Sequence, residues 1–171
     1  MRRSENSLSI RQVILFGILG SFTFALKLGM MALPNIEPVS LLIMVFAVVF
    51  GLKALYPVYI YVVLEILYFG LGTWNVCYLY VWPILTVAAW LLRRMQGSFS
   101  WAVLSGVFGL MFGALCGIVD VFIGGLAYAV TKWAAGIPFD IAHCVGNFLM
   151  ALVLFEPLRK LVCKLYARMG K

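Results

Sequence analysis

The stretch Gly136-Ile-Pro-Phe-Asp-Ile-Ala-His-Cys-Val-Gly-Asn147 opens the last long apolar run of the sequence. Pro138 suits the first turn of a helix, where its missing N–H costs no hydrogen bond. Asp140, His143 and Asn147 follow at i, i+3 and i+7, a spacing that predicts one shared helix face. The apolar run continues beyond Asn147, so this polar face is carried into a membrane, where such groups by default mark a functional site. The alternative is structural, with Asp140 capping the helix and His143 pairing with a neighbouring carbonyl.

The composition of the chain predicts an integral membrane protein. Of its 171 residues, 65% are hydrophobic and 11% are charged, and the mean hydropathy is +1.08. A soluble domain of this length could not bury so much apolar surface, whereas a bilayer accepts it. A span takes about 20 apolar residues, which leaves room for five or six spans and no soluble domain. We therefore predict an all-α, polytopic membrane protein with six transmembrane helices.

The six predicted spans form a single membrane domain over residues 1–171. They cover about residues 10–31, 38–51, 54–70, 76–92, 101–124 and 138–157. The second apolar run holds only about 12 residues, so this span must extend into its loops or the bilayer must thin around it. The remainder, 158–171, interleaves leucines with lysines and arginines and is predicted to be a cationic juxtamembrane helix on the membrane surface.

Basic residues set the predicted orientation of these spans. The net charge is +7, and all but Lys27 and Lys132 of the 13 lysines and arginines lie at run ends or in short connections. That distribution follows the positive-inside rule and differs from the basic patch with interleaved aromatics that is typical of nucleic-acid binding. With six spans it places both the N- and C-termini in the cytoplasm, and it indicates no nucleic-acid partner.

Polar residues that hydrocarbon tolerates poorly gather at one predicted depth, near the outer ends of the spans. The inner halves hold apolar and small residues, whereas an ion or proton pathway would need polar groups at both depths. The pattern therefore favours a cup that is open to the outside and closed below. Its candidate substrate-binding residues are Asn35, Glu37, Glu65, Trp74, Asn75, Tyr78, Trp82, Asp120, Tyr128, Asp140, His143 and Asn147.

The chemistry of these residues favours one class of ligand. The four carboxylates outnumber Lys27 and Lys132, and the aromatic side chains could stack on a flat ring. We therefore expect a neutral or cationic heterocycle with amine or amide donors. For any single tyrosine or tryptophan, membership of an interfacial aromatic belt is the alternative explanation.

Four cysteines are scattered along the chain without a C-x-x-C pair or a regular spacing. They are Cys77, Cys116, Cys144 and Cys163, and most lie inside apolar runs. We predict that they behave as small buried hydrophobic residues and form neither a disulfide framework nor a zinc site.

Two stripes of small residues recur every four positions in the predicted helices. The first consists of Gly17, Ser21, Ala25 and Gly29, and the second of Gly109, Gly113 and Gly117. In lipid, such a stripe lets another helix approach closely, because association there depends on packing. The first stripe could pack within this bundle or dock onto a partner subunit. The second is expected to turn Asp120 toward the bundle.

With these features the chain resembles the substrate-binding S component of an energy-coupling factor (ECF) transporter. The resemblance covers the whole chain and lies in its six spans, small size, cytoplasmic termini and first-span stripe. In that family the stripe is usually alanine-based and docks onto the transmembrane coupling subunit, which implies that role for Gly17, Ser21 and Ala25. The loops 33–38, 70–75 and 125–136 would close over an outward-facing pocket.

The resemblance implies a binding subunit of a prokaryotic plasma membrane and not an enzyme. Such a subunit captures a vitamin or related metabolite from outside, and a coupling subunit with two ATPases drives release by toppling it in the membrane. The chain has no G-x-x-x-x-G-K-[ST] motif and so supplies no ATPase of its own, and no cofactor is implied. Metal-transporting members use a histidine close behind the initiator methionine. The only histidine here is His143, which argues against nickel or cobalt.

Two other classes of function compete with this interpretation. An intramembrane hydrolase could use Glu65, Asp140 and His143, but it needs a nucleophile–base pair or several metal ligands. One histidine and no H-E-x-x-H motif leave little for that chemistry. A helper or assembly subunit that binds no ligand would account for both stripes, but not for the outer acids and aromatics.

Overall fold

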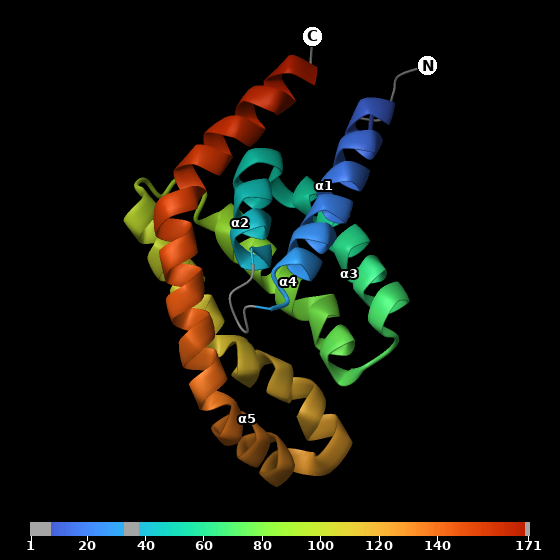
Figure 1. Cartoon of the computed structure of the whole chain (residues 1–171), viewed down its shortest axis with the longest axis vertical. Coiled ribbons are helices and arrows are strands. Elements are labelled where there is room, and N and C mark those ends of the chain that lie inside the picture. The colour runs from blue at the N-terminus through green and yellow to red at the C-terminus, as the bar shows by residue number, and fades with distance from the viewer. Residues whose placement is uncertain (1–7, 33–37, 170–171) are drawn as a thin grey trace.

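The computed structural model describes residues 8–32 and 38–169, whose regular secondary structure is helical, with no β-strand. The helices are α1 (Ile10–Gly29), α2 (Val39–Phe50), the short 3-10 helix η1 (Gly51–Ala54), α3 (Leu55–Phe69), α4 (Thr73–Leu91) and α5 (Ser98–Met169) (Figure 1). In this part of the chain, four helical stretches are long and apolar enough to cross a membrane: Ile10–Gly29, Val39–Phe69, Thr73–Leu91 and Ser98–Arg168. The predicted all-α class is confirmed.

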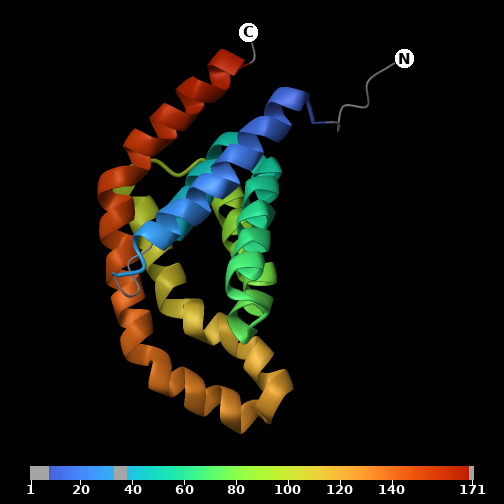
Figure 2. The ribbon, with the colours of Figure 1, turned by 45° about the vertical axis from the view of Figure 1, so that its right-hand side comes forward.

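The long helix α5 reverses direction at a single glycine. At Gly125 the backbone takes φ 81° and ψ 176°, outside the helical region, and glycine adopts positive φ without the steric cost that a Cβ would bring. Figure 2 shows the chain running away from the body of the molecule and then back along it. Residues 98–124 are called the first half of α5 below, and residues 126–169 the second half.

The structure differs from the predicted boundaries at both ends of the last span. The expected loop 125–136 is helical except at Gly125, because one glycine suffices for the turn. Within the expected surface helix 158–171, residues 158–169 continue α5 through Pro157. Its apolar side packs on the protein: the rings of Tyr166 and Phe50 lie 4.9 Å apart, and Gln12 Nε2 donates a hydrogen bond of 2.9 Å to the Tyr166 hydroxyl.

The short helix α2 lies at the centre of the molecule. Ten of its 12 residues are buried, and it packs against α4, α5 and η1. A helix that is apolar on every side needs this kind of enclosure. Its length of about 18 Å, at 1.5 Å per residue, is tolerated because other helices surround it.

Helix α1 packs against α3 through a face one position away from the predicted stripe. Phe16, Gly20 and Thr23 are its buried residues, and a Cβ on Gly20 would lie 2.7 Å from the side chain of Ile60. The stripe itself faces outward. Ser21, Ala25 and Gly29 are exposed, and an added Cβ at Gly17 or Gly29 would meet nothing within 4 Å. Packing of this stripe inside the described bundle is thus excluded.

The second stripe, in contrast, joins the two halves of α5. A Cβ on Gly109 would lie 2.8 Å from the backbone oxygen of His143, and one on Gly113 would lie 2.5 Å from a carboxylate oxygen of Asp140. At Gly117 nothing lies within 4 Å. Gly109 and Gly113 therefore permit the close approach that brings Asp140 and His143 into the interior.

We expect Gly109→Ala to destabilise the protein by about 1–3 kcal/mol, since the new methyl group would overlap backbone atoms and force the halves of α5 apart. Gly117→Ala is the matched control in the same helix, where the open space and the higher helix propensity of alanine should leave stability unchanged or raised by up to about 1 kcal/mol. Thermal unfolding of both variants in the same detergent would measure the difference, and equal stability would contradict this packing.

Candidate functional site

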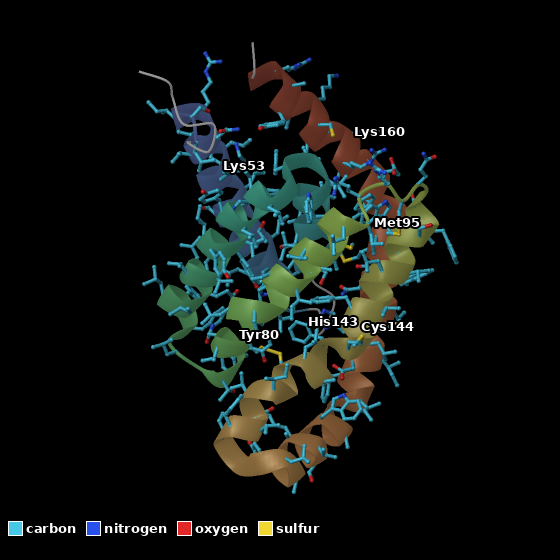
Figure 3. All side chains as sticks on the ribbon, turned by 180° about the vertical axis from the view of Figure 1, so that it is seen from behind. Lys53, Tyr80, Met95, His143, Cys144 and Lys160 are labelled. Atoms are coloured by element: carbon cyan, nitrogen blue, oxygen red, sulfur yellow. A yellow bond between two sulfur atoms is a disulfide. The ribbon has the colours of Figure 1, made fainter. Side chains whose placement is uncertain are left out.

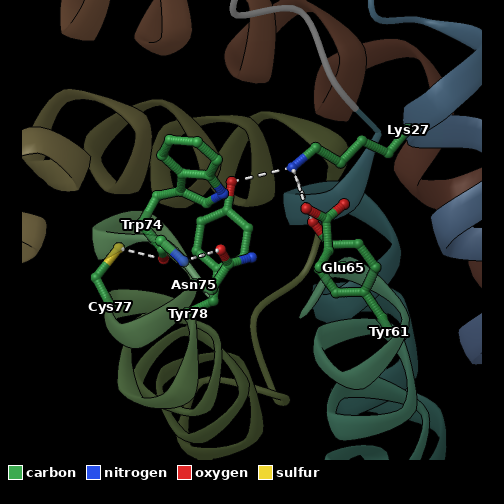
Figure 4. A network of polar contacts seen from close by, with 8 residues as sticks. Lys27, Tyr61, Glu65, Trp74, Asn75, Cys77 and Tyr78 are labelled. Carbon is green, nitrogen blue, oxygen red and sulfur yellow. Dashed lines mark hydrogen bonds and ion pairs between the residues drawn. The ribbon is translucent and has the colours of Figure 1, made fainter. Parts of the chain in front are cut away.

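A buried ion pair between α1 and α3 forms the centre of the candidate site. Lys27 Nζ lies 3.2 Å from Glu65 Oε2, and the two side chains are 16% and 1% exposed (Figure 4). Lys27 follows Phe16, Gly20 and Thr23 on the inward side of α1, and Glu65 continues the buried side of α3. Ionised groups in a low-dielectric interior are costly unless they are paired and hydrogen-bonded, so the two charges depend on each other.

Two tyrosines complete the surroundings of the ammonium group. Lys27 Nζ lies 3.0 Å from the Tyr78 hydroxyl and 3.3 Å from the Tyr61 hydroxyl. It also lies 4.8 Å from the centre of the Tyr78 ring, within cation–π range. Glu65 and Tyr61 are one helical turn apart on α3, while Tyr78 comes from α4 (Figure 4). The cluster therefore ties α1, α3 and α4 together.

Aromatic rings extend the cluster from α4 to both halves of α5. The ring of Trp82 lies 5.2 Å from that of Tyr78 and 5.5 Å from that of Phe112. Phe112 in turn contacts His143, with 4.9 Å between ring centroids. Figure 3 shows His143 in the middle of the molecule, away from the end that carries Lys53 and Lys160.

One face of α4 turns two hydrogen-bond donors into this interior. Asn75, Tyr78 and Trp82 follow at i, i+3 and i+7 and are all buried. Among the residues that the structure describes, Asn75 Nδ2 and Trp82 Nε1 have no hydrogen-bond partner. Asn75 Oδ1 accepts from the Gly72 backbone N–H at 3.0 Å, which holds the amide in place. Buried unpaired donors are rare in native structures and call for an acceptor.

Asn147 lies on the same face of α5 as Asp140 and His143, as the sequence spacing predicted, and all three are buried. Asn147 Nδ2 donates to Ser40 Oγ of α2 at 3.1 Å and to the Ser105 carbonyl at 3.4 Å. Its Oδ1 has no hydrogen-bond partner within the described ranges. The amide therefore links α2 to both halves of α5 and leaves one acceptor available.

Asp140 bridges the two halves of α5. Its Oδ1 accepts a hydrogen bond of 3.0 Å from the backbone N–H of Gly113, and the residue is 6% exposed. Its Oδ2 has no hydrogen-bond partner in the described part of the chain. The structural alternative for Asp140, a cap for its own helix, is not what is observed, since the helix runs continuously past it.

Three predicted site residues lie apart from the central cluster. Asp120 pairs with Lys132 at 2.6 Å across the break at Gly125, and Lys132 is 47% exposed. Trp74 and Tyr128 are 52% and 46% exposed, respectively. Trp74 lies at the start of α4 and Tyr128 just after the break at Gly125. For these two exposed aromatic residues, membership of an interfacial aromatic belt remains the alternative explanation. Asn35 and Glu37, and with them most of the expected loop 33–38, lie outside the described residues.

The structure also joins two of the cysteines. Cys77 of α4 and Cys116 in the first half of α5 form a disulfide, with their Cα atoms 5.2 Å apart. The prediction that the cysteines form no disulfide was wrong for this pair. The bond joins residues 39 positions apart in sequence, so no local spacing could have revealed it. Within residues 8–32 and 38–169, no group of three His, Cys, Asp or Glu side chains could hold a metal ion.

Several residues of the cluster were missed as site residues. Lys27 and Tyr61 had a sequence signal, namely a lysine inside an apolar run and a tyrosine one turn before Glu65. Phe112, Ser40 and Ser105 had none, because a phenylalanine or serine in a span is unremarkable until its neighbours are known. Together the cluster offers aromatic faces, an ion pair and hydrogen-bond donors and acceptors that lack a partner among the described residues.

We expect Glu65→Gln to lower the free energy of unfolding by about 3–5 kcal/mol, because it leaves the Lys27 charge buried without its counterion. Asp120→Asn is the matched control. It removes one member of a pair whose lysine is half-exposed, and it should cost less than about 1 kcal/mol. Unfolding in mixed micelles with increasing dodecyl sulfate would compare the two, and similar losses would show that the Lys27–Glu65 pair is not specially buried.

Comparison of this chain with protein-family models, with curated proteins and with solved structures gives no match.

Proposed function

We propose that this chain is the substrate-binding S component of an ECF-type ABC importer. In this role it captures a vitamin-like neutral or cationic heterocycle outside the cell and delivers it through a coupling subunit driven by two ATPases. The proposal rests on the buried cluster around Lys27 and Glu65. In this cluster, Asn75 Nδ2 and Trp82 Nε1 have no hydrogen-bond partner among the described residues and could bind a ligand. Helix bundles commonly build such ligand sites from side chains on facing helices.

The path of the chain supports six crossings of a plasma membrane with both termini in the cytoplasm. The turn at η1 divides the stretch Val39–Phe69, and the break at Gly125 divides α5, which supports a division of the four apolar stretches into six passes. The start of α1 and the end of α5 lie at one end of the molecule (Figure 1). Lys53 and Lys160 lie toward that same end (Figure 3), which is the cytoplasmic side by the positive-inside rule.

The polar atoms of the cluster support a ligand that carries both hydrogen-bond acceptors and donors. Asn75 Nδ2 and Trp82 Nε1 each need a hydrogen-bond acceptor. Asp140 Oδ2 and Asn147 Oδ1 can each accept a hydrogen bond from a donor on the ligand. Tyr78 and Trp82 supply rings for stacking. A flat heterocycle with ring nitrogens and amine or amide groups meets these demands without adding net negative charge beside Glu65.

The outward stripe on α1 supports a partner that docks in the membrane. Gly17, Ser21 and Ala25 present small side chains on a surface that no described helix covers. Close helix contacts in lipid form through such surfaces. A helper subunit without a ligand would use the same stripe, so bound substrate is the property that separates the two functions.

Mass spectrometry of small molecules released from the purified, denatured protein tests the proposal directly. We expect a heterocycle in stoichiometric amount. Lipid alone would favour the helper subunit, and turnover of an added metabolite would favour an enzyme.

Once the heterocycle is identified, we expect Trp82→Phe to weaken its binding by about three- to tenfold. The substitution keeps an aromatic ring but removes the unpaired indole N–H, and one hydrogen bond contributes about 0.5–1.5 kcal/mol. Trp101→Phe is the matched control, because Trp101 is equally buried but stacks on Phe155 outside the cluster, 4.4 Å between centroids. Titration calorimetry would report both affinities, and equal effects would remove Trp82 from the site.

A further inference from the structure

A polar hollow lies at the opposite end of the molecule from the break in α5. It is a groove of about 700 Å³ between the connection from α4 to α5 and the second half of α5. Its lining residues are Arg93, Arg94, Met95, Gln96, Gly97, Glu156, Arg159 and Lys160. No residue of the cluster around Lys27 lines it, so this basic groove is separate from the proposed substrate site.

The basic groove has four cationic side chains and one carboxylate. Arg159 is engaged with Glu156, with 2.7 Å between Nη2 and Oε2. Arg93 donates to the Trp90 carbonyl at 2.9 Å and lies over the indole ring at 4.9 Å. Arg94 and Lys160 make no ion pair or hydrogen bond within the described ranges, and both are exposed. The groove thus has an excess of positive charge, with two cations available to a ligand.

The start of α5 adds further donors to the same place. Gly97, which lines the groove, has φ 82° and leads directly into the first turn of α5 at Ser98. Backbone N–H groups in the first turn of a helix lack intrahelical acceptors and favour an anion. The backbone at this end of α5 therefore reinforces the charge of Arg94 and Lys160.

Exposed apolar side chains lie close in the sequence to the residues that line the basic groove. Leu91 and Phe99 flank the α4–α5 connection and are 63% and 65% exposed. Val153, one turn before Glu156, is 66% exposed. A ligand with a charged head and apolar tails would match this combination, whereas a soluble anion would leave the apolar border unused.

We propose that the basic groove binds the phosphate-bearing headgroup of an anionic glycerophospholipid from the cytoplasmic leaflet. The phosphate lies between Arg94 and Lys160, and the acyl chains extend over Leu91, Phe99 and Val153. Basic hollows between membrane helices on the cytoplasmic side are suited to such headgroups, and each basic residue near an anionic lipid surface contributes about 1 kcal/mol. This interaction is independent of the transported substrate.

The test uses the full chain purified in a neutral detergent and offered an equal mixture of phosphatidylglycerol and phosphatidylcholine, with bound lipid counted by native mass spectrometry. We expect the wild type to retain phosphatidylglycerol selectively. The double variant R94S/K160S should bind it about 25-fold more weakly, since two contributions of this size are about fivefold each. The variant R94K/K160R, which keeps both charges, should retain most of the binding.

The matched control is K164S/R168S, which removes the same net charge from two positions of α5 beyond Lys160 but leaves the basic groove intact. Its phosphatidylglycerol binding should stay within about twofold of wild type. Equal weakening in the two double variants would overturn the proposal, because it would show attraction to a generally basic surface. Inorganic phosphate that raised the melting temperature as much as phosphatidylglycerol would also overturn it, because the ligand would then be a soluble anion.

Discussion

The ion pair between Lys27 and Glu65 is the constraint on which the rest of the bundle depends. Neither charge could lie in an apolar interior alone, so α1 and α3 must meet at the depth where the two side chains reach each other. Gly20 makes that meeting possible, because a larger residue would overlap Ile60 of α3. Lys27 also hydrogen-bonds to the hydroxyl of Tyr78, which holds α4 against the same ion pair. One electrostatic requirement therefore positions three helices.

Small residues control the other half of the molecule. Gly109 and Gly113 allow the two halves of α5 to approach until Asp140 and His143 reach the interior. Gly125 makes the reversal that brings those halves together. In a bilayer the hydrophobic effect does not hold helices against each other, so close packing and interhelical hydrogen bonds carry that role. The polar residues of the cluster and the glycines beside them are thus parts of one packing arrangement.

The two ends of the molecule use polar residues differently. In the cluster around Lys27, polar atoms are buried, paired with one another or left with unsatisfied hydrogen-bonding capacity, which suits selection of one small molecule. In the basic groove, the cations are exposed and exceed the carboxylate, which suits an anion drawn from the adjacent membrane surface. The two sets of polar residues therefore differ both in burial and in net charge.

The sequence by itself determined the all-α class and the presence of long apolar helices, because hydropathy and the 3.6-residue period are local properties. It also indicated the shared face of Asp140, His143 and Asn147, since helical spacing decides which residues share a face. Only the tertiary structure decided which charges pair, that the first small-residue stripe faces outward, that α5 continues through 126–169, and that Cys77 meets Cys116. Those outcomes depend on how helices distant in sequence are rotated and packed against one another. Local sequence patterns do not specify that geometry.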